Sequence, residues 1–189
     1  MLLRLLLGCL WFACFASFNW AARKHFRNSG VYTRGMRWTF VLATLFALLQ
    51  GVAIYFKPAS MVAASLFYAA SLALFWCTIV TTRDKGLGAC YASIESHELV
   101  TSGPYRWIRH PFYVSYLLAW IAGAAVYPPL SIAPIVMFSF YWRAALEEES
   151  RFRKGPHGRA YDEYCSRTGR FFISFSGTRR RIRAAEASR

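Results

Sequence analysis

The sequence predicts an all-α fold, a multi-pass membrane helical bundle with about five transmembrane helices. Three observations carry this prediction. Of the 189 residues, 56% are hydrophobic, yet Lys and Arg number 23 against 9 for Asp and Glu, a net charge of +14. The first acid is Asp84, and long apolar runs fill the chain before it. A soluble domain this basic would dilute its apolar content, so charge and apolar residues must be segregated along the chain.

The first three spans account for most of the chain before the first acid. They run from Leu2 to Ala22, from Trp38 to Phe56 and from Ala59 to Thr82. Arginines and a lysine follow the first apolar run rather than precede it, which favours a retained anchor over a cleaved signal peptide. The third span has only Ser and Thr as polar residues, whose hydroxyls can bond to carbonyls of their own helix. The short turn at Lys57 and Pro58 makes the second and third spans an antiparallel hairpin.

The fourth and fifth spans form a second hairpin. They run from Phe112 to Tyr127 and from Leu130 to Leu146, joined by Pro128 and Pro129. Proline lacks an amide donor and disfavours helix in the residue before it, so this pair predicts a sharp reversal. Both arms then begin and end on one side of the membrane. The hairpin therefore brings the segment before the fourth span next to the glutamates after the fifth.

Charge sets the expected orientation. Every Arg and Lys except Arg4 and Lys57 falls on one face of the bundle, which predicts an external amino terminus and a cytoplasmic carboxyl terminus and active site in the cell (inner) membrane. Basic residues beside spans indicate topology and anionic lipid, so we expect membrane lipids as partners and no nucleic acid. The expected organisation is three helices in 1–82, a catalytic region with a helical tail in 83–175 and a basic, disordered tail in 176–189.

The cysteines predict neither a disulfide scaffold nor a metal site. They are Cys9, Cys14, Cys77, Cys90 and Cys165, scattered without a C-x-x-C pair. Cysteine inside an apolar run usually serves as a small hydrophobe.

Two polar segments could carry chemistry. Gly103 to Tyr113 combines a Gly-Pro turn with a histidine before a proline, and Pro111 suits the first turn of a helix. Its aromatics and arginines alone are also typical of an interfacial belt. In the second segment, Glu147 to Glu149 place three carboxylates at the membrane edge. They could form a salt-bridged helix end with Arg143, one turn away, or receive a cationic ligand.

Together the two segments resemble the signature of the isoprenylcysteine carboxyl methyltransferase and phospholipid methyltransferase family of integral membrane enzymes. The first half is present as Gly103, Tyr105, Arg106, Arg109, His110, Pro111 and Tyr113, and the second as Glu148, Glu149, Gly158, Tyr161, Tyr164 and Arg167.

This resemblance implies a methyltransferase that uses S-adenosyl-L-methionine and acts on a lipophilic or lipidated acceptor. It implies catalytic roles for Arg167 and Glu149. The acceptor would lie against Arg167, Tyr164 and Tyr161. The cofactor would be bound by Tyr105, Arg109, His110, Pro111, Tyr113, Glu148 and Glu149. Carboxylates suit the cofactor's ammonium or ribose, arginine its carboxylate, and aromatics its adenine and sulfonium. An amine acceptor would instead need a base, for which Glu147 or Glu149 could serve.

Two rival functions stay open. A membrane sterol or enone reductase uses NADPH with a similar Arg-His-Pro motif and tyrosine-rich tail, but Phe112 and Ser115 favour methyl transfer. The other rival is a non-enzymatic protein whose basic tail binds anionic lipid. No glycine fingerprint precedes a helix, so a soluble methyltransferase fold is not supported.

Overall fold

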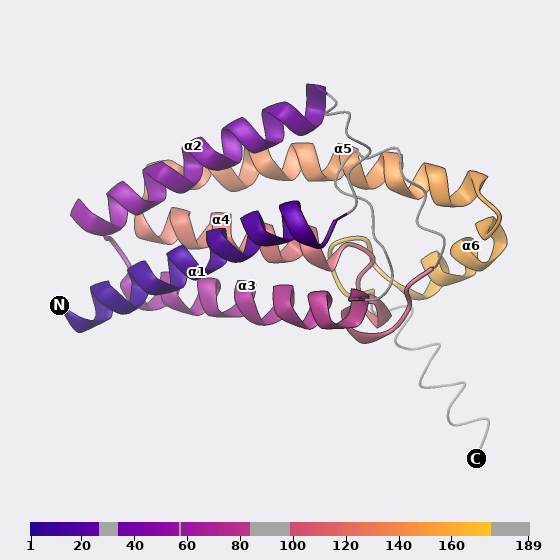
Figure 1. The fold of residues 1–189 in the computed structure, drawn as a ribbon, viewed down its shortest axis with the longest axis horizontal. Coiled ribbons are helices and arrows are strands. Elements are labelled where there is room, and N and C mark those ends of the chain that lie inside the picture. The colour runs from indigo at the N-terminus through magenta and orange to yellow at the C-terminus, as the bar shows by residue number, and fades with distance from the viewer. Residues whose placement is uncertain (27–33, 57, 84–98, 175–189) are drawn as a thin grey trace, which may run out of the picture.

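The computed structural model describes residues 1–26, 34–56, 58–83 and 99–174, and this part of the chain is helical (Figure 1). The predicted basic tail 176–189 lies outside the described residues. The elements are α1 (Leu2–Lys24), α2 (Arg34–Phe56), α3 (Met61–Thr82), η1 (Gly103–Arg106), α4 (Pro111–Val126), η2 (Pro128–Ser131), α5 (Ile132–Lys154) and α6 (Gly158–Arg167). The all-α membrane bundle predicted from composition is confirmed.

Four of the described helical segments are long and apolar enough to cross a membrane: α1, α2, α3 and the η2–α5 segment Pro128–Lys154. The predicted fourth span corresponds to α4, whose 16 residues are fewer than the roughly 20 that a full membrane span needs. Its apolar residues are largely enclosed by the neighbouring helices, with Trp120 and Ala122 buried.

The long helices run side by side along the long axis of the molecule, so their connections gather at its two ends (Figure 1). The amino terminus, the α2–α3 turn and η2 lie at one end, which we call the turn end. There the amide of Ala59 donates to the carbonyl of Val126 at 2.7 Å, and that of Ser60 to Ala125 at 3.1 Å. The start of α4 and helix α6 lie at the other end, which we call the polar end. The predicted α4–α5 hairpin is present. Helices α2 and α3 are joined by a short turn and run in opposite directions, but α3 packs on α4 and α1 and not along α2, so they do not form the packed hairpin that the sequence predicts.

Helices α3 and α4 pack closely because small residues face each other along their contact. The hydroxyl of Ser71 donates to the carbonyl of Ser115 at 2.7 Å across this interface. Near the polar end the rings of Phe75 and Phe112 lie 5.6 Å apart in an edge-to-face arrangement. Small residues that let helix backbones approach are what packing in lipid requires, since hydrocarbon supplies no hydrophobic drive between helices.

A buried hydrogen bond fastens α2 to the same core. The hydroxyl of Tyr68 on α3 donates to Gln50 Oε1 on α2 at 2.7 Å, and Gln50 is fully buried. Gly123 on α4 leaves the room for this amide, because a Cβ there would lie 2.2 Å from Gln50 Nε2. Gln50, the one strongly polar residue of the predicted second span, therefore forms a hydrogen bond that links α2 to α3.

Helix α5 continues about two turns past its predicted end at Leu146, so the prediction was too short. Charged residues with good helix propensity carry it to Lys154, and Arg151, Arg153 and Lys154 in the last turn complement the partial negative charge of a helix carboxyl end. Arg153 also approaches Glu149 one turn earlier, at 3.7 Å. The three glutamates consequently stand on a rigid helix and not in a tail.

The chain after α6 returns to the start of α4 and pairs with it. Residues Ile108 and Gly169 form an isolated parallel bridge. The amide of Arg109 donates to the carbonyl of Gly169 at 2.8 Å, and that of His110 to Arg170 at 3.2 Å. This pairing clamps the segment ahead of α4 between α5 and the returning chain.

Candidate functional site

The backbone before α4 is shaped to present His110. Gly103 has a φ of +54°, in the left-handed region, and a Cβ there would lie 2.2 Å from Thr81 Oγ1. Only glycine combines that conformation with so close an approach. After the short helix η1, Pro111 begins α4, where its missing amide hydrogen has no intrahelical role. His110 is thereby held at the helix start, 9% exposed.

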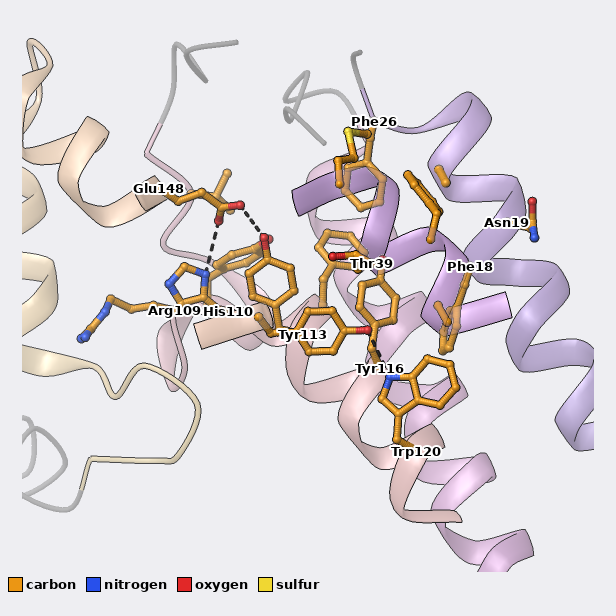
Figure 2. A pocket seen from close by; sticks show the side chains of 18 of the residues that line it. Phe18, Asn19, Phe26, Thr39, Arg109, His110, Tyr113, Tyr116, Trp120 and Glu148 are labelled. Carbon is orange, nitrogen blue, oxygen red and sulfur yellow. Dashed lines mark hydrogen bonds and ion pairs between the residues drawn. The ribbon is translucent and has the colours of Figure 1, made fainter. Parts of the chain in front are cut away.

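Glu148 is the carboxylate that joins His110 to Tyr113. The Tyr113 hydroxyl donates to Glu148 Oε1, and His110 Nδ1 lies 3.5 Å from Glu148 Oε2 (Figure 2). The rings of His110 and Tyr113 are stacked with centroids 5.5 Å apart. The side chain of Glu148 is 27% exposed, so this carboxylate is held in place and still accessible.

Glu149 has a different environment, although it is the next residue. Its side chain is fully buried and accepts two hydrogen bonds from Arg170, from Nε and from the terminal nitrogen, each 2.8 Å long. Arg109 Nε donates to it at 3.1 Å, and His110 Nε2 lies 3.2 Å away. A buried carboxylate needs such partners, because an unpaired charge would be severely penalised away from water.

The two arginines on Glu149 are themselves fixed. Arg109 donates to the backbone carbonyls of Thr168 and Cys165, the latter at 3.3 Å. The Arg170 guanidinium lies 4.8 Å from the ring centroid of Trp142 on α5, a cation–π contact. The Glu149 cluster therefore joins α5, the start of α4 and the returning chain into one rigid unit.

This environment changes the acidity of His110. Burial alone would lower its pKa, but the hydrogen bonds and charges of Glu148 and Glu149 outweigh burial and raise the pKa of His110 above its ordinary value. Protonation is thus favoured, and a protonated ring donates from both nitrogens to the two carboxylates.

A cavity of about 640 Å³ begins at these groups and continues between the helices. At the polar end, its lining comes from the start of α4, the end of α5 and helix α6, and includes Tyr105, Glu148, Arg151 and Tyr161. Deeper, Figure 2 shows Phe18, Tyr116 and Trp120 displaced from Glu148 toward the core of the bundle. The apolar part is lined by α1, α2 and α4.

The apolar part of the cavity also opens sideways. Several of its lining residues on α1 and α2 are exposed at the outer surface of the bundle, among them Phe12, Ala16, Phe40 and Leu48. Because α1 and α2 are candidate membrane spans, a ligand could reach the cavity from the lipid side as well as from the polar end.

The structure brings together most of the residues singled out from the motifs. Those that line the cavity are Tyr105, Arg109, His110, Tyr113, Glu148, Tyr161 and Tyr164. Tyr164 also donates its hydroxyl to the carbonyl of Tyr105 at 2.7 Å. Pro111 and Glu149 are not in the lining. Pro111 shapes the backbone, and Glu149 is enclosed by its partners.

Arg167 lies apart from this group. It is absent from the cavity lining, its side chain is 44% exposed, and it lies 3.3 Å from Glu163 one turn earlier on α6. Its geometry gives no support to the acceptor-binding role assigned from the motif.

Sequence reasoning missed Arg170, Arg151 and the whole apolar lining from α1 and α2. Arg151 comes three residues, about one helical turn, after Glu148, a spacing that would have drawn attention to it if α5 had been predicted at its full length. No sequence pattern marks Arg170 as a site residue, because its position next to Glu149 depends on how the chain returns after α6. Among the described residues, no group of three or more His, Cys, Asp or Glu side chains is arranged to hold a metal ion.

Comparison with known proteins identifies a family for the central segment. Residues 62–151 match the family described as isoprenylcysteine carboxyl methyltransferase. A protein-S-isoprenylcysteine O-methyltransferase B of Arabidopsis thaliana is 37% identical over 76 residues, which cover 39% of this chain and 38% of the relative. The resemblance inferred from the motifs is confirmed for this segment, which contains the first motif together with Glu148 and Glu149, whereas Gly158, Tyr161, Tyr164 and Arg167 lie outside it.

Two bacterial relatives match a longer stretch. The cobalt-zinc-cadmium resistance protein CzcN of Cupriavidus metallidurans is 29% identical over 109 residues, covering 57% of this chain and 45% of the relative. The nickel-cobalt-cadmium resistance protein NccN of Alcaligenes xylosoxydans xylosoxydans is 29% identical over 111 residues, covering 57% and 46%. The match thus spans less than half the length of each curated relative. No solved structure matches the chain.

Proposed function

Because residues 62–151 carry the sequence of the isoprenylcysteine carboxyl methyltransferase family, we propose that the protein is an S-adenosyl-L-methionine-dependent membrane methyltransferase acting on a lipophilic acceptor. One observation carries this proposal furthest. A single cavity joins an accessible, oriented carboxylate, Glu148, to an apolar compartment open between two candidate spans. A polar cofactor could enter this cavity from the polar end and an apolar acceptor from between α1 and α2, so that the two molecules meet inside it.

The residues at the polar end fit the cofactor's chemistry. When bound, S-adenosylmethionine supplies a methyl group already activated by a sulfonium. Glu148 offers a carboxylate for the ammonium, and the Tyr161 ring, stacked on Phe152 with centroids 5.1 Å apart, offers an aromatic face. Methyl transfer needs no covalent enzyme intermediate, so these residues have to bind, orient and exclude water.

His110 and Tyr113 support this role by holding Glu148. The Tyr113 hydroxyl donates to one oxygen of the Glu148 carboxylate and His110 Nδ1 lies 3.5 Å from the other, which holds the carboxylate toward the cavity. Glu149 in turn secures His110 from the other side. In this proposal Glu148 contacts the cofactor, while Glu149 positions its neighbours.

The acceptor is proposed to be an isoprenylcysteine-like carboxylate or another lipid or small amphipathic molecule, with its chain in the apolar compartment. Its charged group needs a cation near the polar end. The motif assigned that role to Arg167, but Arg151 lines the cavity and Arg167 does not. We therefore assign the carboxylate to Arg151. The polar end is proposed to face the cytoplasm, in agreement with the distribution of basic residues.

Isothermal calorimetry of the detergent-purified protein with S-adenosylhomocysteine, and in parallel with NADPH, tests the function. We expect binding of S-adenosylhomocysteine and its loss in Glu148→Ala, with Glu147→Ala as the matched control because Glu147 is exposed on the same helix. Binding of NADPH alone would identify a reductase. Binding of neither would leave the lipid-binding alternative.

Methyl transfer from labelled cofactor then tests the arginine assignment. Arg151→Ala should retain S-adenosylhomocysteine binding and lose turnover with a prenylcysteine acceptor, whereas Arg167→Ala should retain both. Loss of turnover in Arg167→Ala with a normal Arg151→Ala would restore the assignment made from the motif.

A further inference from the structure

Trp11 lines the apolar end of the cavity, where its side chain reaches from α1 to α2. Its indole Nε1 donates to the carbonyl of Ala47 at 3.1 Å. The far edge of the ring lies against Gly51, where a Cβ would be 2.9 Å from Trp11 Cζ2. Trp11 is thus fixed by a hydrogen bond on one side and by a glycine that makes room for it on the other.

Toward the turn end, beyond this ring, the bundle is filled by buried apolar side chains. Leu7 and Ile54 are buried there and belong to the apolar cluster against which Trp11 itself packs. Toward the polar end, the Trp11 ring contacts that of Phe15, with centroids 6.0 Å apart. Phe15 in turn packs on Trp120, with ring centroids 5.2 Å apart. Trp11 therefore lies between the apolar end of the cavity and buried side chains nearer the turn end.

The helical rise gives the depth of Trp11 in the bundle. Trp11 and Ala22 both line the cavity on α1, and at about 1.5 Å per residue they are roughly 16 Å apart along the helix. That is about half of the ~30 Å hydrocarbon thickness of a bilayer. A chain that starts at the polar end therefore meets Trp11 near the middle of the membrane.

We propose that Trp11 is the specificity-determining residue that limits the length of the acceptor's hydrocarbon chain. The inference rests on the proposed function for the identity of the occupant, an isoprenoid or alkyl tail. Continuity of the cavity from Glu148 to Trp11 supports that occupant, since one molecule with a polar head and an apolar tail fills both parts. A chain that reaches the ring gains affinity with each buried segment, and a longer one has to bend or leave.

Equilibrium binding tests this independently of catalysis. The probes are N-acetyl-S-geranylcysteine and its farnesyl and geranylgeranyl analogues, titrated into the detergent-purified full chain. We expect binding to tighten by roughly a hundredfold or more for each added isoprene unit that is fully buried, and no further gain once the chain outgrows the cavity. Trp11→Ala should move this break to a longer chain. Gly51→Ala should also move it, because its methyl group displaces the ring.

Trp20→Ala is the matched control. It removes the same side chain from the same helix, but Trp20 stacks on Trp76 and does not line the cavity, so its chain-length profile should equal that of the unmodified protein. Trp11→Phe provides a milder change should Trp11→Ala fail to fold, and its smaller ring should relax the break in the same direction.

The proposal is overturned if the profile is the same in the folded Trp11 and Gly51 variants as in the unmodified protein. It is also overturned if affinity neither rises nor breaks with chain length, as happens when long chains leave between α1 and α2, or if no prenylcysteine binds. A Trp11-dependent break in the chain-length profile without any methyl transfer would support the role of Trp11 and reject the proposed function. The two failures are therefore distinguishable.

Discussion

The sharpest test of the site concerns Glu149, whose substitution by glutamine keeps the shape of the side chain and removes its charge. Four groups surround this buried carboxylate: Arg170, Arg109, His110 and, at 3.7 Å, Arg153. After the substitution two poorly exposed guanidinium groups lose their counter-charge, Arg109 at 11% exposed and Arg170 at 22%.

The expected cost follows from that geometry. Breaking a buried ion pair by removing one partner destabilises by about 3–5 kcal/mol. We expect the lower end, about 3 kcal/mol, because Arg109 keeps two backbone carbonyls and Arg170 keeps the face of Trp142. For a chain of this size that corresponds to a fall of roughly 6–12 °C in apparent Tm.

Differential scanning fluorimetry of the protein in one detergent measures this shift. Glu147→Gln is the matched control, because it makes the same chemical change two residues away at an exposed position and should move the apparent Tm by only about 1–2 °C. Glu149→Gln should also still bind S-adenosylhomocysteine below its melting temperature. An unchanged Tm together with lost binding would refute the reasoning and return Glu149 to the role of a direct ligand.

Three further predictions follow from the same contacts. The raised pKa of His110 means that its stabilisation is complete below about pH 6.5 and is lost as the pH rises through the folded-state pKa, so the Tm difference from His110→Gln should shrink as the pH is raised above about 6.5. Arg170→Ala should cost about 2 kcal/mol in a denaturant titration, and Arg170→Lys less, because lysine keeps the charge without the paired donors. Gly103→Ala, forced into the left-handed region and against Thr81, should lower the apparent Tm by several degrees, whereas Gly8→Ala, in open space on α1, should not.

Membrane character, the two chain reversals and the resemblance to the family could be predicted from the sequence because each depends on local or compositional signals. Runs of about 20 apolar residues, a proline pair and motif spacing hold in any tertiary context. The length of α5 was underestimated for the converse reason, because the charged residues after Leu146 were read as tail when their helix propensity and pairing with Asp162 and Glu149 extend the helix.

The division of labour between Glu148 and Glu149 could not be predicted. The two side chains are adjacent and chemically identical, and a helix turns them about 100° apart, so their surroundings depend on which elements pack on each face. One faces the cavity with Tyr113, and the other is buried under Arg109 and Arg170. Only the tertiary structure supplies that difference.

The sequence by itself determined that this chain is a helical membrane protein, and its motifs resemble those of the isoprenylcysteine carboxyl methyltransferase family. The membrane character follows from composition and charge, and the family resemblance follows from the motif residues and their order. The tertiary structure decided which side chains line the cavity, placed Arg167 outside it, brought Arg170 onto Glu149 and placed Trp11 at its apolar end. These depend on contacts between residues far apart in the chain, such as Trp11 with Ala47 and His110 with Arg170, and no local pattern encodes the packing that makes them neighbours.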